Sequence, residues 1–158
     1  MSLVRQAALL LALVSAGLLL GALGFQYLGG LAPCEMCYWQ RYGHVAVLVI
    51  AGLALLFDRR ALGWLAVAAM LAAAALGLYH AGVELKWWQG ITSCTAPVQS
   101  GMSTADMLNA LRAAPLVRCD AVPWSLLGLS MAGWNALISA GAAVCGGMVL
   151  VFAGRAGR

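Results

Sequence analysis

The chain has 158 residues, of which 64% are hydrophobic and only 9% are charged. A soluble globular domain carries about 25% charged residues, so this composition excludes an ordinary soluble domain and predicts a membrane protein. The net charge of +4 comes from nine basic residues that form no basic run, which argues against a nucleic-acid partner.

Four apolar runs follow one another along the chain. They cover residues 7–24, 42–57, 61–79 and 123–152, approximately. Their lengths are near the ~20 residues that cross a hydrocarbon layer, and backbone in lipid must satisfy its own hydrogen bonds. The first run follows Arg5 and could be mistaken for a cleaved signal peptide, but the rest of the chain is equally apolar. The sequence therefore predicts an all-α membrane protein, a single four-transmembrane-helix bundle over residues 1–158.

The arginines predict the orientation of this bundle. One side of the membrane would hold Arg5, Arg59, Arg60, Arg155 and Arg158 against Asp58 alone. The positive-inside rule places that side, with both termini, in the cytoplasm. The loops of about 25–41 and 80–122 then face outward. They contain four of the five cysteines, in a compartment where disulfides form and persist.

The second outer loop shows the pattern of a short helix. Ser103 with Asp106 three residues later resembles a capping box, and Met107, Leu108 and Leu111 would share one face. We expect a short amphipathic helix at the membrane surface, between Cys94 and Cys119. An ordinary loop helix without membrane contact fits the pattern equally.

The first outer loop contains a Cys-x-x-Cys motif, Cys34 to Cys37. Such a motif serves redox chemistry, half of a zinc site or, with a following histidine, haem attachment. Tyr38 excludes the last use. The wide spacing of Cys94 and Cys119 provides no second zinc knuckle, so we expect no metal site. Two cysteine pairs, one close in sequence and one widely spaced, suit a disulfide relay. Two static disulfides are the alternative.

Arg41 lies four residues after Cys37, so the two share a face if the second helix begins near Pro33. A helix N-terminus and a guanidinium both favour a thiolate, so we expect a lowered pKa for Cys37. Arg41 could also hold an oxygen of a lipid-soluble electron acceptor. Its alternative role is that of an interfacial arginine that reaches toward the lipid headgroups.

The two histidines, His44 and His80, are predicted at the outer ends of their helices. Equal depth would permit a bis-histidine b-type haem, or proton handling beside a quinone. For His44 we favour an ordinary interfacial polar residue. Cys145, late in the fourth run, is expected to be a small packing residue.

The segment from Pro33 to Arg41 resembles the first outer loop of the bacterial disulfide bond formation protein B (DsbB) family, with its pattern P-C-x-x-C-x-x-x-R. The resemblance extends to His80 at the end of the third run and to the Cys94/Cys119 pair. It continues through Cys-Asp-Ala-Val-Pro-Trp-Ser-Leu-Leu-Gly-Leu-Ser-Met-Ala-Gly-Trp-Asn into the fourth run. Some members carry glutamate where this chain has Gln40, so we assign no acid–base role there.

The resemblance implies a quinone-dependent thiol oxidase of the bacterial inner membrane, which reoxidises a periplasmic thioredoxin-fold oxidant of the DsbA type. Cys94 would form the mixed disulfide with this partner, and the released Cys119 would attack Cys34. Cys37 would be freed as a thiolate against a quinone, either ubiquinone or menaquinone from the membrane pool. The implied catalytic residues are Cys34, Cys37, Cys94 and Cys119, and the implied quinone-binding residues are Cys37, Arg41 and His80.

Three other functions compete with this interpretation. A quinone reductase resembling vitamin K epoxide reductase also has four helices, but there the Cys-x-x-Cys motif is expected in a late helix. A b-type cytochrome would use His44 and His80. A membrane scaffold would use the cysteines only as structural disulfides.

Overall fold

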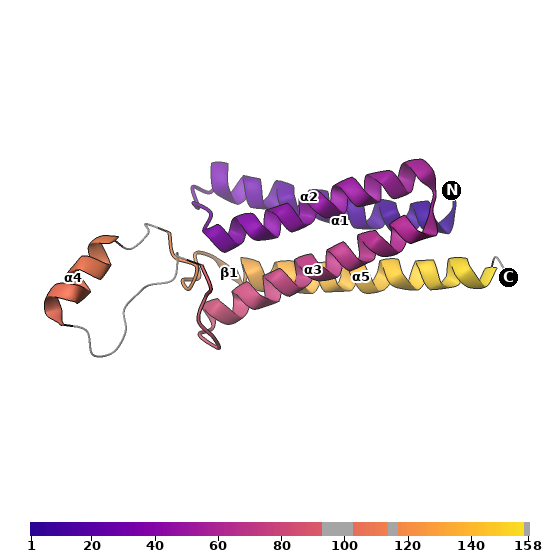
Figure 1. Cartoon of the computed structure of the whole chain (residues 1–158). Helices are drawn as coiled ribbons and strands as arrows, with labels where there is room; N and C mark the ends of the chain where they lie inside the picture. The colour runs from indigo at the N-terminus through magenta and orange to yellow at the C-terminus, as the bar shows by residue number, and fades with distance from the viewer. Residues whose placement is uncertain (93–102, 114–116, 157–158) are drawn as a thin grey trace.

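The computed structural model of the protein describes residues 1–92, 103–113 and 117–156. Four long helices lie side by side as an elongated bundle (Figure 1). They are α1 (Leu3–Tyr27), α2 (Glu35–Phe57), α3 (Arg60–Glu84) and α5 (Met131–Ala156). Within the described residues, these four helices are long and apolar enough to cross a membrane. The predicted all-α, four-transmembrane-helix bundle is therefore confirmed.

Both termini and the turn between α2 and α3 lie at one end of the bundle, and the cysteine loops lie at the other (Figure 1). Asp58 ends α2 and connects the N-terminus to this turn. Its carboxylate accepts a 2.5 Å hydrogen bond from the Ser2 hydroxyl and lies 3.7 Å from Arg5 Nε. Arg5, Arg59 and Arg60, three of the arginines that the sequence assigns to one side, thus lie at one end of the bundle.

The second helix begins at Glu35, whereas the sequence predicted about residue 42. Cys34 is its N-cap, and the Cys34 sulfur accepts a hydrogen bond from the backbone N–H of Cys37. Because of this cap, the helix begins before the apolar run begins. The polar residues Gln40 and Arg41 therefore lie inside the helix. At its far end, α3 extends to Glu84, beyond the predicted end at residue 79. Hydropathy underestimates both helices because their outer turns carry polar residues.

The predicted fourth helix over 123–152 was wrong at its start, because residues before Met131 form a small hairpin. The hairpin pairs β1 (Ser125–Leu126) with β2 (Leu129–Ser130) in antiparallel register. Leu127 and Gly128 both have positive φ, 53° and 80°, as the two central residues of a type I′ turn require. Ser130 then caps α5, since its hydroxyl accepts the N–H of Gly133 at 3.1 Å. An unbroken apolar run concealed this turn from hydropathy.

The second outer loop contains the predicted short helix, α4 (Thr104–Ala113). Ser103 caps it by accepting the N–H of Asp106 at 3.2 Å. The Asp106 carboxylate accepts a 2.6 Å hydrogen bond from the Ser103 hydroxyl, where a capping box would use the Ser103 backbone N–H. Met107 and Leu108 are exposed. Contact of this helix with a membrane surface stays a prediction.

Small side chains bring the four helices into close contact, as is usual in membrane bundles. A Cβ atom on Gly77 of α3 would lie 3.0 Å from the backbone nitrogen of Ala136 and 3.1 Å from the carbonyl oxygen of Ala132, both in α5. Backbone atoms cannot swing aside as a flexible side chain can. Gly77 therefore fixes the spacing of α3 and α5, next to the functional site described below.

Replacing Gly77 with leucine is expected to destabilise the protein by about 2 kcal/mol, because overpacking forces the two backbones apart. The measurement is the unfolding free energy in detergent. Gly141→Leu is the matched control, since a Cβ on Gly141 meets no atom within 4 Å. Equal losses in the two variants would contradict this account of Gly77.

Candidate active site

The Cys-x-x-Cys motif forms a close thiol pair at the N-terminus of α2. The sulfur atoms of Cys34 and Cys37 lie 2.8 Å apart, and both cysteines are free thiols. The backbone N–H of Cys37 also donates to the Cys34 sulfur at 3.2 Å. The helix start thus folds the motif into one compact redox unit.

The two sulfur atoms have different environments. The hydrogen bond with Cys37, together with burial, raises the pKa of the Cys34 thiol well above its ordinary range. Either sulfur can donate in this pair, and the raised pKa favours the proton on Cys34. The sequence predicts that the helix N-terminus and Arg41 favour a thiolate at Cys37; in the structure the backbone N–H of the first turn points at the Cys34 sulfur. Cys37 receives the thiol hydrogen bond, which also favours negative charge on its sulfur.

Cys119 comes from the far end of the second outer loop and lies beside this pair. Its side chain is fully buried and packs in one cluster with Cys34, Met36 and Val83. Cys119 is disulfide-bonded. Cys94 lies outside the described residues, so its predicted pairing with Cys119 stays a prediction. Three of the four predicted catalytic cysteines are described, and they converge at one end of the bundle.

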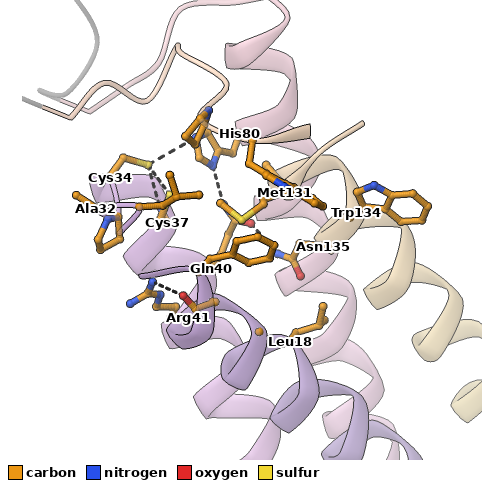
Figure 2. A pocket seen from close by; sticks show the side chains of 18 of the residues that line it. Leu18, Ala32, Cys34, Cys37, Gln40, Arg41, His80, Met131, Trp134 and Asn135 are labelled. Atoms are coloured by element: carbon orange, nitrogen blue, oxygen red, sulfur yellow. Dashed lines mark hydrogen bonds between the residues drawn. The ribbon is translucent and has the colours of Figure 1, made fainter. Parts of the chain in front are cut away.

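His80 of α3 lies beside the Cys34–Cys37 pair (Figure 2) and also contacts the Cys119 segment. Its Nε2 lies 3.1 Å from the carbonyl oxygen of Cys119 and 3.7 Å from the Cys34 sulfur. A carbonyl only accepts hydrogen bonds, so Nε2 carries the proton. The other ring nitrogen, Nδ1, then accepts a 2.7 Å hydrogen bond from the Gln40 amide. His80 is thus held in one tautomer, with its N–H directed at the cysteines.

A chain of buried hydrogen bonds continues from Gln40 into the bundle. The Asn135 amide donates to Gln40 Oε1 at 2.7 Å, and Asn135 Oδ1 accepts from His44 Nε2 at 2.8 Å. His44 Nδ1 accepts from the Ser15 hydroxyl at 3.2 Å. We call this set the polar chain; its members are Ser15, His44, Asn135, Gln40 and His80. All four transmembrane helices contribute to it.

The polar chain corrects the interpretation of His44 as an interfacial residue. His44 is buried, and it lies well inside α2 because that helix begins at Glu35. Both ring nitrogens of His44 and of His80 already have protein partners. Since the Gln40 and Asn135 amides link the two rings, the arrangement presents no pair of imidazoles to one haem iron.

The ligand atoms of Cys34, Cys37 and His80 lie within 4.8 Å of one another, which would suit a metal ion. Two details oppose it. The sulfur separation of 2.8 Å is shorter than the roughly 3.8 Å between two thiolates on one tetrahedral zinc, given Zn–S bonds of about 2.3 Å. His80 Nε2 carries a proton and so has no lone pair for a metal. The three residues are arranged for thiol chemistry.

A cavity of about 650 Å³ opens beneath the thiol pair, bounded largely by apolar side chains of α1 and α5, with the polar face of α2 on one side. Arg41 lines it, with Nη1 donating to Gln26 Oε1 at 2.6 Å and Nη2 to the carbonyl of Ala22 at 3.3 Å. Among the described residues, the buried Arg41 Nε has no hydrogen-bond partner. An apolar cavity of this size with one unpaired cationic donor suits a flat, lipid-soluble molecule that carries an acceptor oxygen.

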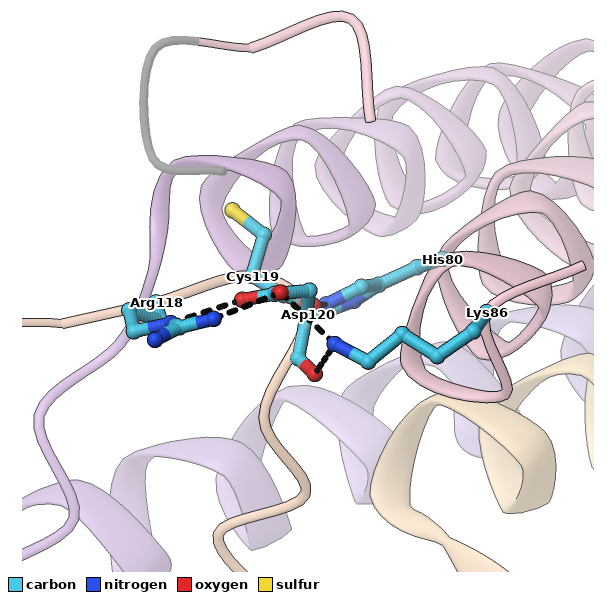
Figure 3. A network of polar contacts seen from close by, with 5 residues as sticks. All are labelled: His80, Lys86, Arg118, Cys119 and Asp120. Carbon is cyan, nitrogen blue, oxygen red and sulfur yellow. Dashed lines mark hydrogen bonds and ion pairs between the residues drawn. The ribbon is translucent and has the colours of Figure 1, made fainter. Parts of the chain in front are cut away.

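A second polar cluster lies outside the thiol pair (Figure 3). The Asp120 carboxylate accepts from Arg118 Nε and Nη2 at 2.9 and 2.8 Å and from Lys86 Nζ at 2.6 Å. The hydrogen bond from Arg118, followed by that from Lys86, holds the pKa of Asp120 well below its usual range. This cluster stabilises the folded protein fully above the ordinary carboxyl pKa of about 4. The stabilisation is lost as the pH falls toward the lower pKa that Asp120 has in the folded protein.

Sequence reasoning missed the roles of Gln40 and Asn135, and it misplaced Cys145. Polar residues in transmembrane helices are rare and often functional, so the two amides carried a signal that hydropathy did not use. Cys145 is a free thiol exposed on the outside of the bundle, whereas the sequence predicted a packing residue.

Comparison with known proteins shows the family of this chain. The family model described as DsbB, disulfide bond formation protein DsbB, matches residues 4–149. The chain is 34% identical over 138 residues to the disulfide bond formation protein B of Marinobacter nauticus, which covers 79% of each chain. It is 34% identical over 146 residues to that of Verminephrobacter eiseniae, which covers 84% of this chain and 78% of the relative. For that of a Polaromonas species the identity is 30% over 155 residues, which covers 93% and 90%.

No solved structure gives a significant match. The matched region contains all four transmembrane helices almost entirely, together with the thiol pair, His80 and the Cys119 segment. The chain therefore belongs to the disulfide bond formation protein B (DsbB) family.

Proposed function

We propose that this protein is a quinone-dependent thiol oxidase that reoxidises a periplasmic dithiol oxidant of the DsbA type. Family membership gives the chain a redox role in disulfide bond formation. The observation that carries the finer proposal is the position of Cys37, which lines an apolar cavity together with the unpaired Nε of Arg41. A thiol beside such a cavity can pass electrons to a molecule that arrives from the lipid phase.

The two cysteine pairs would pass the electrons inward in steps. A thiolate of the partner attacks Cys94, and the electron pair of the broken bond leaves on Cys119. The Cys119 thiolate then attacks the Cys34 sulfur of a Cys34–Cys37 disulfide; the new bond joins Cys119 to Cys34, and Cys37 leaves as the thiolate. The burial of Cys119 supports this order, because a large soluble partner can reach only an exposed sulfur.

Arg41, Cys37 and His80 would hold the quinone, either ubiquinone or menaquinone. When bound, the quinone supplies a two-electron acceptor. Arg41 Nε–H is the free donor for one of its oxygens, and the apolar cavity wall excludes water. A DsbA-type oxidant has a potential of about −120 mV, well above that of ordinary structural disulfides. Its reoxidation therefore requires a stronger acceptor than another protein disulfide, which supports a quinone.

The proposal includes an orientation in the bacterial inner membrane. The end that carries the termini and the Arg59–Arg60 turn would be cytoplasmic, following the positive-inside rule. The end that carries Cys34, Cys37 and Cys119 would be periplasmic, where disulfides persist. The separation of the arginine-rich end from the cysteine end supports this orientation (Figure 1).

One assay tests the proposal directly. Purified protein is mixed with a short-chain quinone and a reduced thioredoxin-fold partner, and the loss of quinone absorbance is followed. We expect one quinol for each partner disulfide formed. Partner oxidation without quinone reduction would contradict the proposed acceptor. A spectrum of the purified protein without haem bands would separate the proposal from the b-type cytochrome alternative.

Replacing Arg41 with alanine is expected to raise the KM for quinone about tenfold, because a charge-assisted hydrogen bond contributes about 1.5–3 kcal/mol. The KM for the partner should not change. Steady-state kinetics with each substrate varied in turn provide the measurement. Gln26→Ala is the matched control, since it removes the anchor of Nη1 and keeps the Nε–H donor. A quinone KM that Arg41→Ala leaves unchanged would assign Arg41 to the lipid headgroups.

A further inference from the structure

The backbone of Cys119 is bound to the end of α3 at Cys119 itself and at the residue that follows it. His80 Nε2 donates to the carbonyl of Cys119 itself at 3.1 Å. Lys86 binds the next residue, Asp120. Its Nζ donates to the Asp120 carbonyl at 2.5 Å and to the Asp120 carboxylate at 2.6 Å. Arg118 closes the cluster through two hydrogen bonds to the same carboxylate (Figure 3). We call Lys86 and Asp120 the latch.

Lys86 occupies a backbone position that ordinarily belongs to glycine. The N–H of Lys86 bonds to the carbonyl of Val83, and the N–H of Trp87 bonds to that of Gly82. These two bonds form a Schellman motif, in which the residue at Lys86 adopts a left-handed conformation and is usually glycine. Lys86 indeed has φ +62°. A lysine held in this strained conformation indicates that its side chain has a role. Its ammonium group binds Asp120.

The latch holds Cys119 against the sulfur that it must attack in the proposed relay. Cys119 and Cys34 belong to one buried cluster. His80 Nε2 contacts both segments, at the Cys119 carbonyl and at the Cys34 sulfur. Three hydrogen bonds from His80 and Lys86 to residues 119–120 thus hold Cys119 beside the thiol pair.

We propose that Lys86 and Asp120 are positioning residues for the exchange between the two cysteine pairs, because they hold Cys119 over Cys34. The inference rests on the proposed relay and assigns these residues to one step of it. In that step the Cys119 thiolate forms a bond to the Cys34 sulfur, the Cys34–Cys37 bond breaks, and the electron pair leaves on Cys37. Thiolate attack requires the attacking sulfur in line with the bond that breaks, so a small displacement of Cys119 slows it strongly.

A merely structural ion pair would behave differently. Lys86 is exposed over 61% of its side chain, and exposed ion pairs contribute little to stability. Loss of the ammonium should therefore leave the fold intact and change the rate of one step. That separation between stability and rate makes the inference testable.

The decisive variant is Lys86→Gly, which removes the ammonium and at the same time relieves the positive φ. Its unfolding temperature should equal or exceed that of the wild type. We expect kcat for partner oxidation to fall at least about tenfold, while the KM for quinone stays unchanged. Lys86→Arg, which restores a cationic donor, should recover most of the rate.

A direct readout uses quinone-depleted protein mixed with the reduced partner and quenched by alkylation. Mass spectrometry of the peptides then follows the appearance of the Cys34–Cys119 disulfide with time. In Lys86→Gly this disulfide should form about tenfold more slowly than in the wild type. Asp58→Gly is the matched control, because Asp58 is also a charged residue with positive φ. It ends α2, in the turn that lies at the opposite end of the bundle.

The outcomes separate the latch from the proposed function. If the wild type forms the Cys34–Cys119 disulfide and Lys86→Gly forms it equally fast, the latch is overturned and the relay stands. If the wild type forms no such disulfide and reduces no quinone, the relay itself fails and the latch fails with it. A lower unfolding temperature for Lys86→Gly would also count against the latch, because it would give the residue an ordinary structural role.

Discussion

Replacing Cys37 with serine is expected to reduce quinone turnover to the uncatalysed background. A serine hydroxyl does not form the anion that a thiol forms at neutral pH. Position 37 then provides neither a leaving group for the exchange at Cys34 nor a thiolate that donates electrons into the cavity. The outer disulfide should nevertheless remain. The variant should therefore oxidise up to one equivalent of partner and reduce no quinone, as measured by partner thiol titration and quinone absorbance in parallel.

Two further cysteine variants bracket this result. Cys94→Ser should oxidise no partner at all, because the partner's thiolate then has no disulfide to attack. Cys145→Ser should keep near wild-type turnover, since Cys145 is exposed on the outside of α5, about 14 residues and roughly 20 Å along the helix from its start. Full turnover by Cys37→Ser, or by Cys94→Ser, would show that the order of the relay is wrong.

The sequence predicted the parts of the fold that depend on lipid. The four predicted apolar runs form four transmembrane helices, and the arginine-rich segments lie at one end of the bundle. Hydropathy detects such helices because every residue in them faces lipid or another helix. The same measure failed at the outer ends of α2 and α3, where Gln40, Arg41 and His80 interrupt the apolar pattern and yet continue the helix.

The start of α5 was mispredicted for the opposite reason. Residues 123–130 are apolar enough to resemble a helix, but Gly128 and the cap at Ser130 divide them into a hairpin and a helix start. A turn of this kind is specified by two residues with positive φ, and one of them is Leu127, which no propensity would have suggested. Only the tertiary contacts of the hairpin, such as the bond from Trp134 Nε1 to the Leu126 carbonyl, explain that conformation.

The sequence names candidate site residues but not the contacts between them. The structure brings Cys34, Cys37, Arg41 and His80 to one cavity. The partners that orient these residues come from other helices. Asn135 is 95 residues from Gln40, and Asp120 is 34 residues from Lys86. Pairings over such separations follow from the packing of the bundle, and a single sequence does not encode them in any local pattern.

The direction of the polar chain follows from its ends. The carbonyl of Cys119 forces His80 Nε2 to donate, and each following member then has its donor and acceptor fixed in turn. Amides do not readily pass a proton along, so the chain is better suited to hold His80 than to conduct protons. A fixed His80 keeps its N–H between Cys119 and Cys34. The buried interior of the bundle thus determines the geometry of the thiol chemistry at its end.

Replacing Asn135 with leucine tests this link and should have the largest effect on stability of any change in the polar chain. Leucine leaves the Gln40 carbonyl oxygen without its donor, and it leaves His44 Nε2 and the Ser139 hydroxyl without their acceptor. Each unsatisfied buried group costs about 1–3 kcal/mol in a protein core. Polar pairs in membrane bundles are worth less, about 0.6 kcal/mol on average. We therefore expect a loss of about 2 kcal/mol, measured as the unfolding free energy in detergent.

A double-mutant cycle separates broken hydrogen bonding from poor packing. His44→Leu combined with Asn135→Leu removes both sides of one bond, so the double variant should be more stable than the sum of the single losses by about 1 kcal/mol. Ser139→Ala, which removes one donor to the same oxygen, should cost less than Asn135→Leu. Turnover should fall in Asn135→Leu, since a released His80 no longer fixes the Cys119 carbonyl. Additive losses with unchanged turnover would instead make Asn135 a packing residue, and the orientation of His80 would then have to arise from Cys119 alone.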